Sequence, residues 1–378
     1  MNPLKILIIF TAILDTSLVY APQPLAPVLS QYFKVSLHEI SWVMSITLMP
    51  LAFAPILYGY LLEKFSLKKI LIFSLFFCAL FQMIANSSDD FYFFLAFRFL
   101  QALCIPAILT ALLTLLTRIE TQNIQKNVAL YVAATTFGGF VGRVFGSYLS
   151  DMISWHFALN FFAFLMLVCA LVFCFFKDLS SSLNANTSPK DFLIYLRKSE
   201  FLALLCCVFV VFFSLQSIVS FLPFHLKESY ENITQAQIGF VYLGFLTGAI
   251  SSLLIDKTIK VLKSRINTAI FGFLVFITGC LSMMINDFLW SFVSMFVLCS
   301  GMFICHCIFS AILSLKISQK GLASGLYLTF YYSGGAVGSV FPSFYYESLG
   351  WNFLCILTMF ILFFTLMLFL KFKRFYEV

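Results

Sequence analysis

Charge is scarce in this sequence, and its scarcity argues against most soluble classes of protein. Only 10% of the 378 residues are charged, with 23 Lys+Arg and 16 Asp+Glu. A soluble domain carries roughly 25% charged residues, because that many are needed to solvate its surface. A soluble enzyme, a nucleic-acid-binding protein and a secreted disulfide scaffold are therefore all disfavoured. Apolar residues are abundant instead, since 62% of the chain is hydrophobic and the mean hydropathy is +1.00.

Sequence patterns for metal, disulfide or nucleotide chemistry are also lacking. The 11 cysteines fall inside apolar runs without the paired spacing of a zinc site, so we expect them to pack as small hydrophobic side chains. Cys305, His306 and Cys307 are consecutive, and successive helical residues diverge by about 100°, so they cannot converge on one ion. No G-x-x-x-x-G-K-[ST] phosphate loop and no nucleophile–base cluster occurs. We expect no metal, no cofactor, no bound nucleic acid and no enzymatic activity.

Long apolar runs recur along the whole chain and predict membrane-spanning helices. A helix that crosses a bilayer needs about 20 mostly apolar residues at a rise of ~1.5 Å each. Runs of this length are separated here by breaks rich in charge, Gly, Pro, Asn or Ser, and they lack the alternation of membrane β-strands. The twelve predicted spans are 4–27, 39–62, 70–86, 91–116, 127–149, 155–176, 201–225, 236–255, 267–285, 288–314, 322–346 and 350–370.

The basic residues predict which side each loop faces, because cytoplasmic loops retain Lys and Arg. With the N-terminus inside, 19 of the 23 Lys and Arg fall in cytoplasmic segments, 2 fall on the opposite side and 2 lie within spans. This alternation agrees with an even number of spans. We therefore expect an all-α polytopic membrane protein with both termini in the cytoplasm.

The longest polar segment divides the chain into two halves. Residues 179–200 include a Ser- and Asn-rich stretch that cannot bury apolar area, which is typical of a flexible linker. We expect a six-helix bundle over 1–178, a cytoplasmic linker over 179–200 and a second six-helix bundle over 201–378.

The two halves repeat each other in sequence. Gly138-Gly139-Phe140-Val141-Gly142 returns as Gly334-Gly335-Ala336-Val337-Gly338, and Trp155 returns as Trp351. Both pairs have the same offset (334 − 138 = 351 − 155 = 196) and lie on matching predicted spans. A shared offset indicates an internal duplication. Two related helical halves leave a cavity between them in transporters that alternate between inward- and outward-open states.

Two motifs resemble signatures of the major facilitator superfamily. Gly59-Tyr60-Leu61-Leu62-Glu63-Lys64-Phe65-Ser66-Leu67-Lys68-Lys69 resembles G-x-x-x-D-R-x-G-R-[KR], and Arg98-Phe99-Leu100-Gln101-Ala102 resembles R-x-x-Q-G. The glycine stripes of spans five and eleven look most like those of YnfM-type permeases, which are grouped with drug:proton antiporters and arabinose-efflux-like proteins. The resemblance covers essentially the whole chain. It implies the major facilitator fold, with two pseudo-symmetric six-helix bundles.

The resemblance also implies roles for the loop after span two. Glu63 stands where the signature has Asp, and it is followed by Lys64; Asp256 and Lys257 form a weaker counterpart after span eight. The family pattern implies that these elements pair with helix ends and stabilise the outward-facing state. The alternative is that both are ordinary positive-inside loops. Leu67 departs from the signature, which has an arginine there.

Asp15 and Arg98 carry charge inside predicted spans, where a charge costs from ~2.5 to over 10 kcal/mol. Asp15 lies about 11 residues into span one, ~16 Å from its start and close to the midplane. Burial favours its protonated form and a nearby arginine favours its charged form, so we predict that Asp15 is the proton-coupling group. Arg98 is a candidate partner. The alternatives are a carboxylate that caps polar groups in a kinked helix and an arginine that acts as a structural tether.

Arg143 lies near the outer end of span five, among glycines spaced one turn apart. Such glycines let two helices approach closely. We expect a structural or gating role for Arg143, with an outer-face acid such as Asp151 as a candidate partner. The predicted gating or structural set is Gly59, Glu63, Lys64, Gly138, Gly142, Arg143, Asp256, Gly334 and Gly338.

Polar and aromatic side chains one helical turn apart predict the lining of a substrate cavity. Gln216 and Ser220 share a face of span seven, as Tyr327 and Tyr331 do on span eleven. His306 titrates near neutrality and could relay a proton or bind substrate. The alternative for His306 and for both tyrosines is helix packing. The predicted cavity set is Gln101, Gln216, Ser220, His306, Tyr327 and Tyr331.

Together these features predict a secondary transporter of the bacterial cytoplasmic (inner) membrane that exports a small organic or drug-like solute by proton antiport. The proton gradient is the expected energy source, the partners are protons, lipid and a small-molecule substrate, and the protein is expected to be a monomer. Proton symport or facilitated uptake is the alternative within the same class. A membrane receptor or scaffold that transports nothing is the alternative from another class.

Overall fold

The computed structural model of this protein describes residues 2–64, 66–119, 124–176, 189–317 and 319–377, with only the backbone described at 54–64, 124–125, 189–192 and 320–321. The chain forms two compact units, each described here by itself. The first unit comprises Met1–Ala185 with Asn232–Phe240, and the second comprises Asn186–Glu231 with Val241–Val378.

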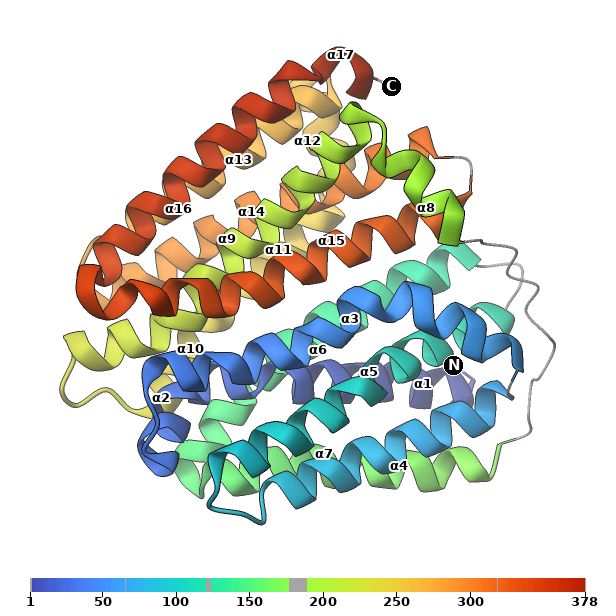
Figure 1. The fold of residues 1–378 in the computed structure, drawn as a ribbon, viewed down its shortest axis with the longest axis vertical. Helices are drawn as coiled ribbons and strands as arrows, with labels where there is room; N and C mark the ends of the chain where they lie inside the picture. Colours follow the sequence, from blue (N-terminus) through green and yellow to red (C-terminus); the bar gives the residue numbers. More distant parts are fainter. Residues whose placement is uncertain (1, 65, 120–123, 177–188, 318, 378) are drawn as a thin grey trace. The chain divides into compact units, whose positions relative to one another are not determined.

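The first unit is built from long helices that begin at strong local signals (Figure 1). Asn2 caps the first helix by accepting from the N–H of Leu4, and Ser66 and Ser154 cap later ones in the same way. Its helices are α1 (Pro3–Tyr20), α2 (Pro22–Phe33), α3 (Leu37–Lys64), α4 (Leu67–Ala85), α5 (Phe91–Ile119), α6 (Ile124–Met152) and α7 (Trp155–Cys174). Most of α10 (Gln235–Val241) groups with this unit.

The second unit is also helical, and Ser264 and Asp287 cap two of its long helices. One helix, α16, bends at Gly350, whose φ of 73° is accessible to glycine without strain. The helices are α8 (Pro189–Leu196), α9 (Ser199–Ser229), α11 (Phe245–Leu253), α12 (Ile255–Leu262), α13 (Arg265–Ser282), α14 (Phe288–Lys316), α15 (Lys320–Val340), α16 (Tyr346–Lys371) and α17 (Lys373–Tyr376), with 3-10 turns η2 (Tyr242–Gly244) and η3 (Phe341–Phe344).

The helices agree with the predicted spans within a few residues at most ends. Among the described residues, ten helices are long and apolar enough to cross a membrane. The predicted spans 39–62 and 322–346 coincide with α3 and α15, which are not among those ten. Within the segment 179–200 that was predicted as a linker, residues 189–196 form α8, a helix that begins at Pro189, where proline is favoured at the first helical position.

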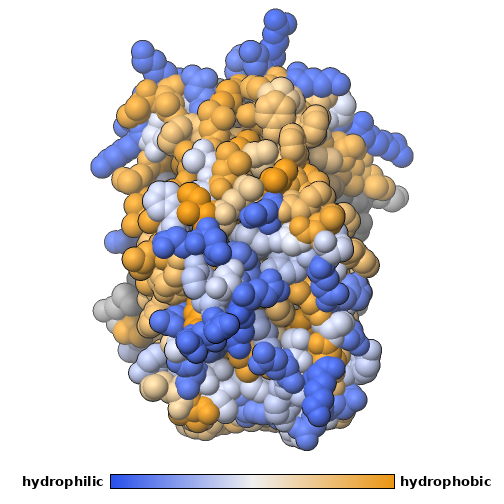
Figure 2. All heavy atoms as spheres, turned by 90° about the vertical axis from the view of Figure 1, so that its left-hand side faces the viewer, coloured by the Kyte–Doolittle hydropathy of each residue, from blue (hydrophilic) through white to orange (hydrophobic). Residues whose placement is uncertain are grey.

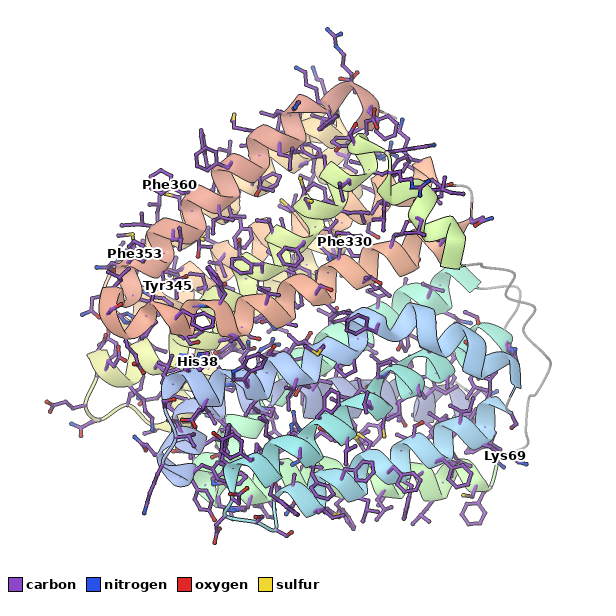
Figure 3. All side chains as sticks on the ribbon, viewed as in Figure 1. His38, Lys69, Phe330, Tyr345, Phe353 and Phe360 are labelled. Carbon is purple, nitrogen blue, oxygen red and sulfur yellow. The ribbon has the colours of Figure 1, made fainter. Side chains whose placement is uncertain are left out.

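The outward-facing side chains are those of a protein in lipid. Phe364, Phe164 and Leu274, which lie in predicted spans, are 67%, 55% and 52% exposed, and the face drawn in Figure 2 shows orange apolar side chains beside blue hydrophilic ones. Figure 3 shows Phe353 and Phe360 pointing away from the bundle along the outer edge of α16. Large apolar side chains are costly to expose to water, but they are not costly to expose to the hydrocarbon of a bilayer.

The two units repeat the same packing. In the first unit α1 packs on α6 and α4 packs on α5 and α7; in the second α9 packs on α15 and α13 packs on α14 and α16. A Cβ placed on Gly142 would lie 2.2 Å from the carbonyl oxygen of Ser17, and one on Gly338 would lie 2.3 Å from that of Phe213. These two contacts are related by the offset of 196 found in the sequence, so the duplication extends to the closest helix contacts.

The two repeated tryptophans differ in one hydrogen bond, which leads to a prediction about stability. Trp351 Nε1 donates to the carbonyl oxygen of Met283 at 2.8 Å, whereas Trp155 Nε1 is buried without a described acceptor. We expect Trp351→Phe to lower the free energy of unfolding by about 1 kcal/mol more than Trp155→Phe, since only the former breaks a bond. Thermal unfolding of both purified variants measures this. Equal losses would contradict the assignment.

Candidate functional site

Asp15 lies in the interior of the first unit with no partner for its carboxyl group. It is on α1, near the middle of the apolar run Pro3–Phe33, and it is 0% exposed. Neither carboxyl oxygen accepts a hydrogen bond from a described residue. The neighbouring hydroxyls are engaged elsewhere, because Thr16 donates to Ala12 O at 2.9 Å and Ser17 donates to Ile13 O at 2.7 Å. A buried, unpartnered carboxyl is a group that can gain or lose a proton but is costly to hold charged.

Arg98 is fully buried on α5 and donates to three oxygens. Nη1 donates to Gln82 Oε1 at 2.5 Å, and Nη2 lies 3.3 Å from Thr47 Oγ1 and 3.5 Å from the carbonyl oxygen of Leu18. Leu18 is one turn beyond Asp15 on α1, so the guanidinium binds the same helix that carries the carboxyl. The suggested pairing of Arg98 with Asp15 is not among these hydrogen bonds. The acceptors of the guanidinium are instead neutral oxygens, and its buried Nε has no described partner.

Gln101 lies one turn from Arg98 and is also fully buried. Its Nε2 lies 3.5 Å from the sulfur of Cys78, and its Oε1 has no described partner. The structure therefore places Gln101 one turn from Arg98 on α5, and the Arg98 guanidinium reaches α1 at Leu18, one turn from Asp15.

Arg143 occupies a second polar cluster in the first unit, on α6. Its Nε donates to Gln23 Oε1 at 2.7 Å, Nη1 donates to Gly139 O at 2.9 Å, and the guanidinium lies 4.1 Å from the ring centre of Tyr20. A cation over an aromatic face is attracted by the ring quadrupole. The suggested partner Asp151 is exposed and accepts from the backbone N–H of Gln235 at 3.2 Å.

The predicted glycines lie where helices touch. Gly138 and Gly142 face α1, and the carbonyl oxygen of Gly138 accepts from the hydroxyl of Ser17 at 2.9 Å. Gly334 and Gly338 face α9 in the second unit, in the same arrangement. Their packing role is visible in these contacts, and the gating role stays a prediction.

Three predicted cavity residues of the second unit form one cluster. The hydroxyl of Tyr327 on α15 lies 2.6 Å from Nδ1 of His306 on α14. The rings of His306 and Tyr331 lie 5.0 Å apart, and Tyr331 stacks on Phe212 of α9 with ring centres 3.8 Å apart and an angle of 8°. We call Phe212, His306, Tyr327 and Tyr331 the aromatic cluster. It combines flat rings with one hydroxyl–imidazole pair.

Gln216 and Ser220 follow Phe212 along α9 at intervals of one turn. They are 0% and 7% exposed. A residue spacing of four places all three on one face of the helix. The cavity residues predicted for this unit thus lie on α9, α14 and α15, and α9 packs directly on the other two.

The predicted loop residues Glu63 and Lys64 have side chains that lie outside the described residues, and Gly59 is described by its backbone alone. Asp256 is exposed in the first turn of α12, where a negative charge is favourable at a helix N-terminus.

Three residues that contact Arg98 or Tyr331 were not predicted from the sequence: Gln82, Thr47 and Phe212. Gln82 was detectable, because it is an amide within a predicted apolar span, as Gln101 is. Thr47 carried no distinguishing signal, since threonine is common in membrane helices and bonds its own backbone. Phe212 is one of 50 phenylalanines and could not be singled out.

The chain matches known transporters over nearly its whole length. A sequence model of the Major Facilitator Superfamily matches residues 6–339. An uncharacterized transporter of Buchnera aphidicola subsp. Schizaphis graminum is 26% identical over 369 residues, covering 95% of this chain and 88% of that protein. The inner membrane transport protein YnfM of Escherichia coli K12 is 25% identical over 354 residues, covering 92% and 85%.

Solved structures share the fold at low sequence identity. The nucleoside transporter NupG superposes with a TM-score of 0.84 at 15% identity, covering 99% of this chain and 100% of that one. A bacterial homologue of the human lysosomal transporter Spinster gives 0.78 at 12% identity, covering 98% and 96%. The protein has the major facilitator fold, with multiple membrane-spanning helices. The chain belongs to the major facilitator superfamily.

Proposed function

We propose that this protein exports a small organic solute across the bacterial cytoplasmic membrane by alternating access, in exchange for protons that enter. Membership of a transporter family supports the transport step. The observation that carries the proton step is Asp15, a fully buried carboxyl group without a described hydrogen-bond partner. Holding such a group charged costs several kcal/mol, so its proton content is set by whether water or solute reaches it.

The proposed exchange relies on the way that access of water or solute changes the protonation of Asp15. When the site opens to the side with more protons, Asp15 takes up a proton; when solute enters from the other side, the proton leaves. The loop elements Glu63-Lys64 and Asp256-Lys257, together with the glycine contacts, are proposed to set the balance between the two open states. Proton symport would use the same carboxyl group with solute and proton travelling together.

The aromatic cluster supports a planar solute. Offset or parallel stacking on Tyr331 favours flat rings, and the Tyr327–His306 pair offers one hydrogen-bonding edge. NupG is a nucleoside transporter by name, and a nucleobase is a planar ring with polar edges. Nucleosides therefore belong beside lipophilic aromatic dyes among the solutes to be tested.

Vesicles that contain only this protein test the proposal. We expect one or more of these solutes to accumulate when the lumen is acidic and the medium is near neutral, because protons leaving the lumen drive solute inward by antiport. A collapsed gradient should abolish accumulation. Accumulation that requires an acidic medium instead would establish symport, and absence of any gradient-driven movement across the whole panel would contradict the proposal.

The role of the aromatic cluster gives a separate prediction. Tyr331→Leu keeps apolar bulk but removes the ring, and we expect it to raise the apparent KM about tenfold, equivalent to about 1.4 kcal/mol, while proton coupling persists. Phe360→Leu is the matched control, since Figure 3 shows this ring pointing outward from α16. An unchanged KM in Tyr331→Leu would exclude the cluster from the substrate site.

A further inference from the structure

Arg98 is the first member of a continuous chain of amide hydrogen bonds. Its Nη1 donates to Gln82 Oε1, and Gln82 Nε2 donates to Asn86 Oδ1 at 2.9 Å. Asn86 Nδ2 donates to Asn160 Oδ1 at 2.8 Å and to the carbonyl oxygen of His156 at 3.3 Å. We call Gln82, Asn86 and Asn160 the amide relay. It runs from α5 through α4 to α7, entirely within the first unit.

The direction of every bond in the relay is fixed by the arginine. A guanidinium group only donates, so Gln82 must present its oxygen to Arg98 and its NH₂ group to Asn86. Asn86 must then accept with its oxygen and donate onward to Asn160. Each amide dipole therefore has its negative end toward the positive charge, and in a poorly polarisable interior such aligned dipoles reinforce one another.

This arrangement supplies the stabilisation that a buried cation ordinarily takes from a carboxylate. Gln82 is fully buried and Asn86 is 8% exposed, whereas Asn160 is half-buried, so the end of the relay nearest Arg98 is the part shielded from water. Leu18 O and Thr47 Oγ1 supply two more neutral acceptors to Arg98. The carboxyl group of Asp15, one turn from Leu18, has no hydrogen-bond partner among the described residues.

The helices of this unit carry other titratable groups, among them Asp15 on α1, Cys78 on α4 and Cys104 on α5, which also carries Arg98. From α3 the contact is the hydroxyl of Thr47. Of the remaining helices of this unit, α7 presents the carbonyl of His156 to the relay, and α6 carries Arg143 toward Gln23 and Tyr20.

We propose that the aligned dipoles of the amide relay stabilise the charge of Arg98 in place of a carboxylate partner, which leaves the Asp15 carboxyl group free of an ion pair and able to exchange the coupling proton. Gln82 is thus a positioning residue that acts through Arg98. The inference rests on the proposed function for its purpose, but its central statement concerns only the protonation of Asp15 and is testable without any solute.

The experiment is infrared difference spectroscopy of the purified full-length protein at neutral pH. A protonated carboxyl group has a carbonyl stretch that a carboxylate lacks, and the band that disappears in Asp15→Asn is that of Asp15. In Gln82→Leu the guanidinium loses its best acceptor and draws Asp15 into an ion pair, so we expect at least a tenfold loss of this band. In Gln82→Glu a carboxylate neutralises Arg98 directly, and we expect the Asp15 band to remain.

Two further variants distinguish loss of the relay from misfolding of the protein. Asn127→Leu removes a fully buried amide of α6 that lies outside the relay, and its Asp15 band should equal that of the wild type. Asn86→Leu breaks the relay one step farther from the arginine, so it should lose about half of the band; this variant decides the matter if Gln82→Leu does not fold.

An undiminished Asp15 band in the folded relay variants overturns the inference, as does an equal loss in Gln82→Glu and Gln82→Leu. Failure of the proposed function has a different signature. If Asp15→Asn keeps gradient-driven transport, then proton exchange at Asp15 is wrong, whatever the spectra of the Gln82 variants show.

Discussion

Asp15→Asn is expected to abolish gradient-driven accumulation of solute while leaving the protein folded. Asparagine keeps the volume and the polarity of the side chain but cannot bind and release a proton. With one proton exchanged per solute, a gradient of about 1 pH unit stores about 1.4 kcal/mol, which supports about a tenfold concentration ratio in the wild type. The variant should give a ratio of about one.

The measurement needs a readout of binding as well as of accumulation. Asp15→Asn should still exchange labelled solute for unlabelled solute across a vesicle membrane without a gradient, because that exchange needs no net proton movement. Asp151→Asn is the matched control, since this carboxyl group is exposed at the end of α6 and should be dispensable for coupling. Full accumulation in Asp15→Asn would remove the physical basis of the proposal.

Gly142→Ala is expected to destabilise the first unit severely. The added Cβ would lie 2.2 Å from the carbonyl oxygen of Ser17 and 2.7 Å from its Cα, both backbone atoms of α1. A backbone cannot yield as a side chain does, so α1 must shift away from α6 and weaken the Ser17–Gly138 hydrogen bond. We expect a loss of about 3 kcal/mol or more in the free energy of unfolding, at the upper end of overpacking effects.

Gly146→Ala provides the control on the same helix face. Its Cβ would lie 3.1 Å from the Cβ of Ala21 and 3.6 Å from both the Cα of Ala21 and the Cε2 of Phe162, so we expect a loss below about 1 kcal/mol. Thermal unfolding of the two variants in detergent compares them directly. Similar unfolding temperatures for Gly142→Ala and the wild type would show that α1 and α6 are less tightly packed than described.

The architecture was largely predictable because bilayer thickness imposes a length and a composition on each helix. The predicted span 201–225 corresponds to Ser199–Ser229, and span 155–176 corresponds to Trp155–Cys174. The repeat was visible because close contact between two helix backbones favours glycine, and Gly142 and Gly338 make such contacts at equivalent positions of the two units. The orientation of the termini and the limits of the linker stay predictions.

The candidate site was only partly predictable, because its composition follows from tertiary contacts. Charge inside an apolar run identified Asp15 and Arg98, since that cost is evident from the sequence. Which oxygens satisfy Arg98 depends on how α4 is rotated against α5, and a sequence does not give that rotation. The amides of Gln82 and Asn86 are uncharged, so the same search passed over them. Phe212 was missed because it is one of 50 phenylalanines, while its stacking partner Tyr331 was found through its spacing of one helical turn from Tyr327.

Proton release on binding tests the central claim most directly. Purified protein in weakly buffered detergent is mixed with a solute found by the vesicle screen, and a pH indicator reports protons released per protein. We predict that the wild type releases about one proton at saturation and that Asp15→Asn binds the same solute with no release. Equal proton release by both proteins, or binding by the wild type without any release, would contradict the account.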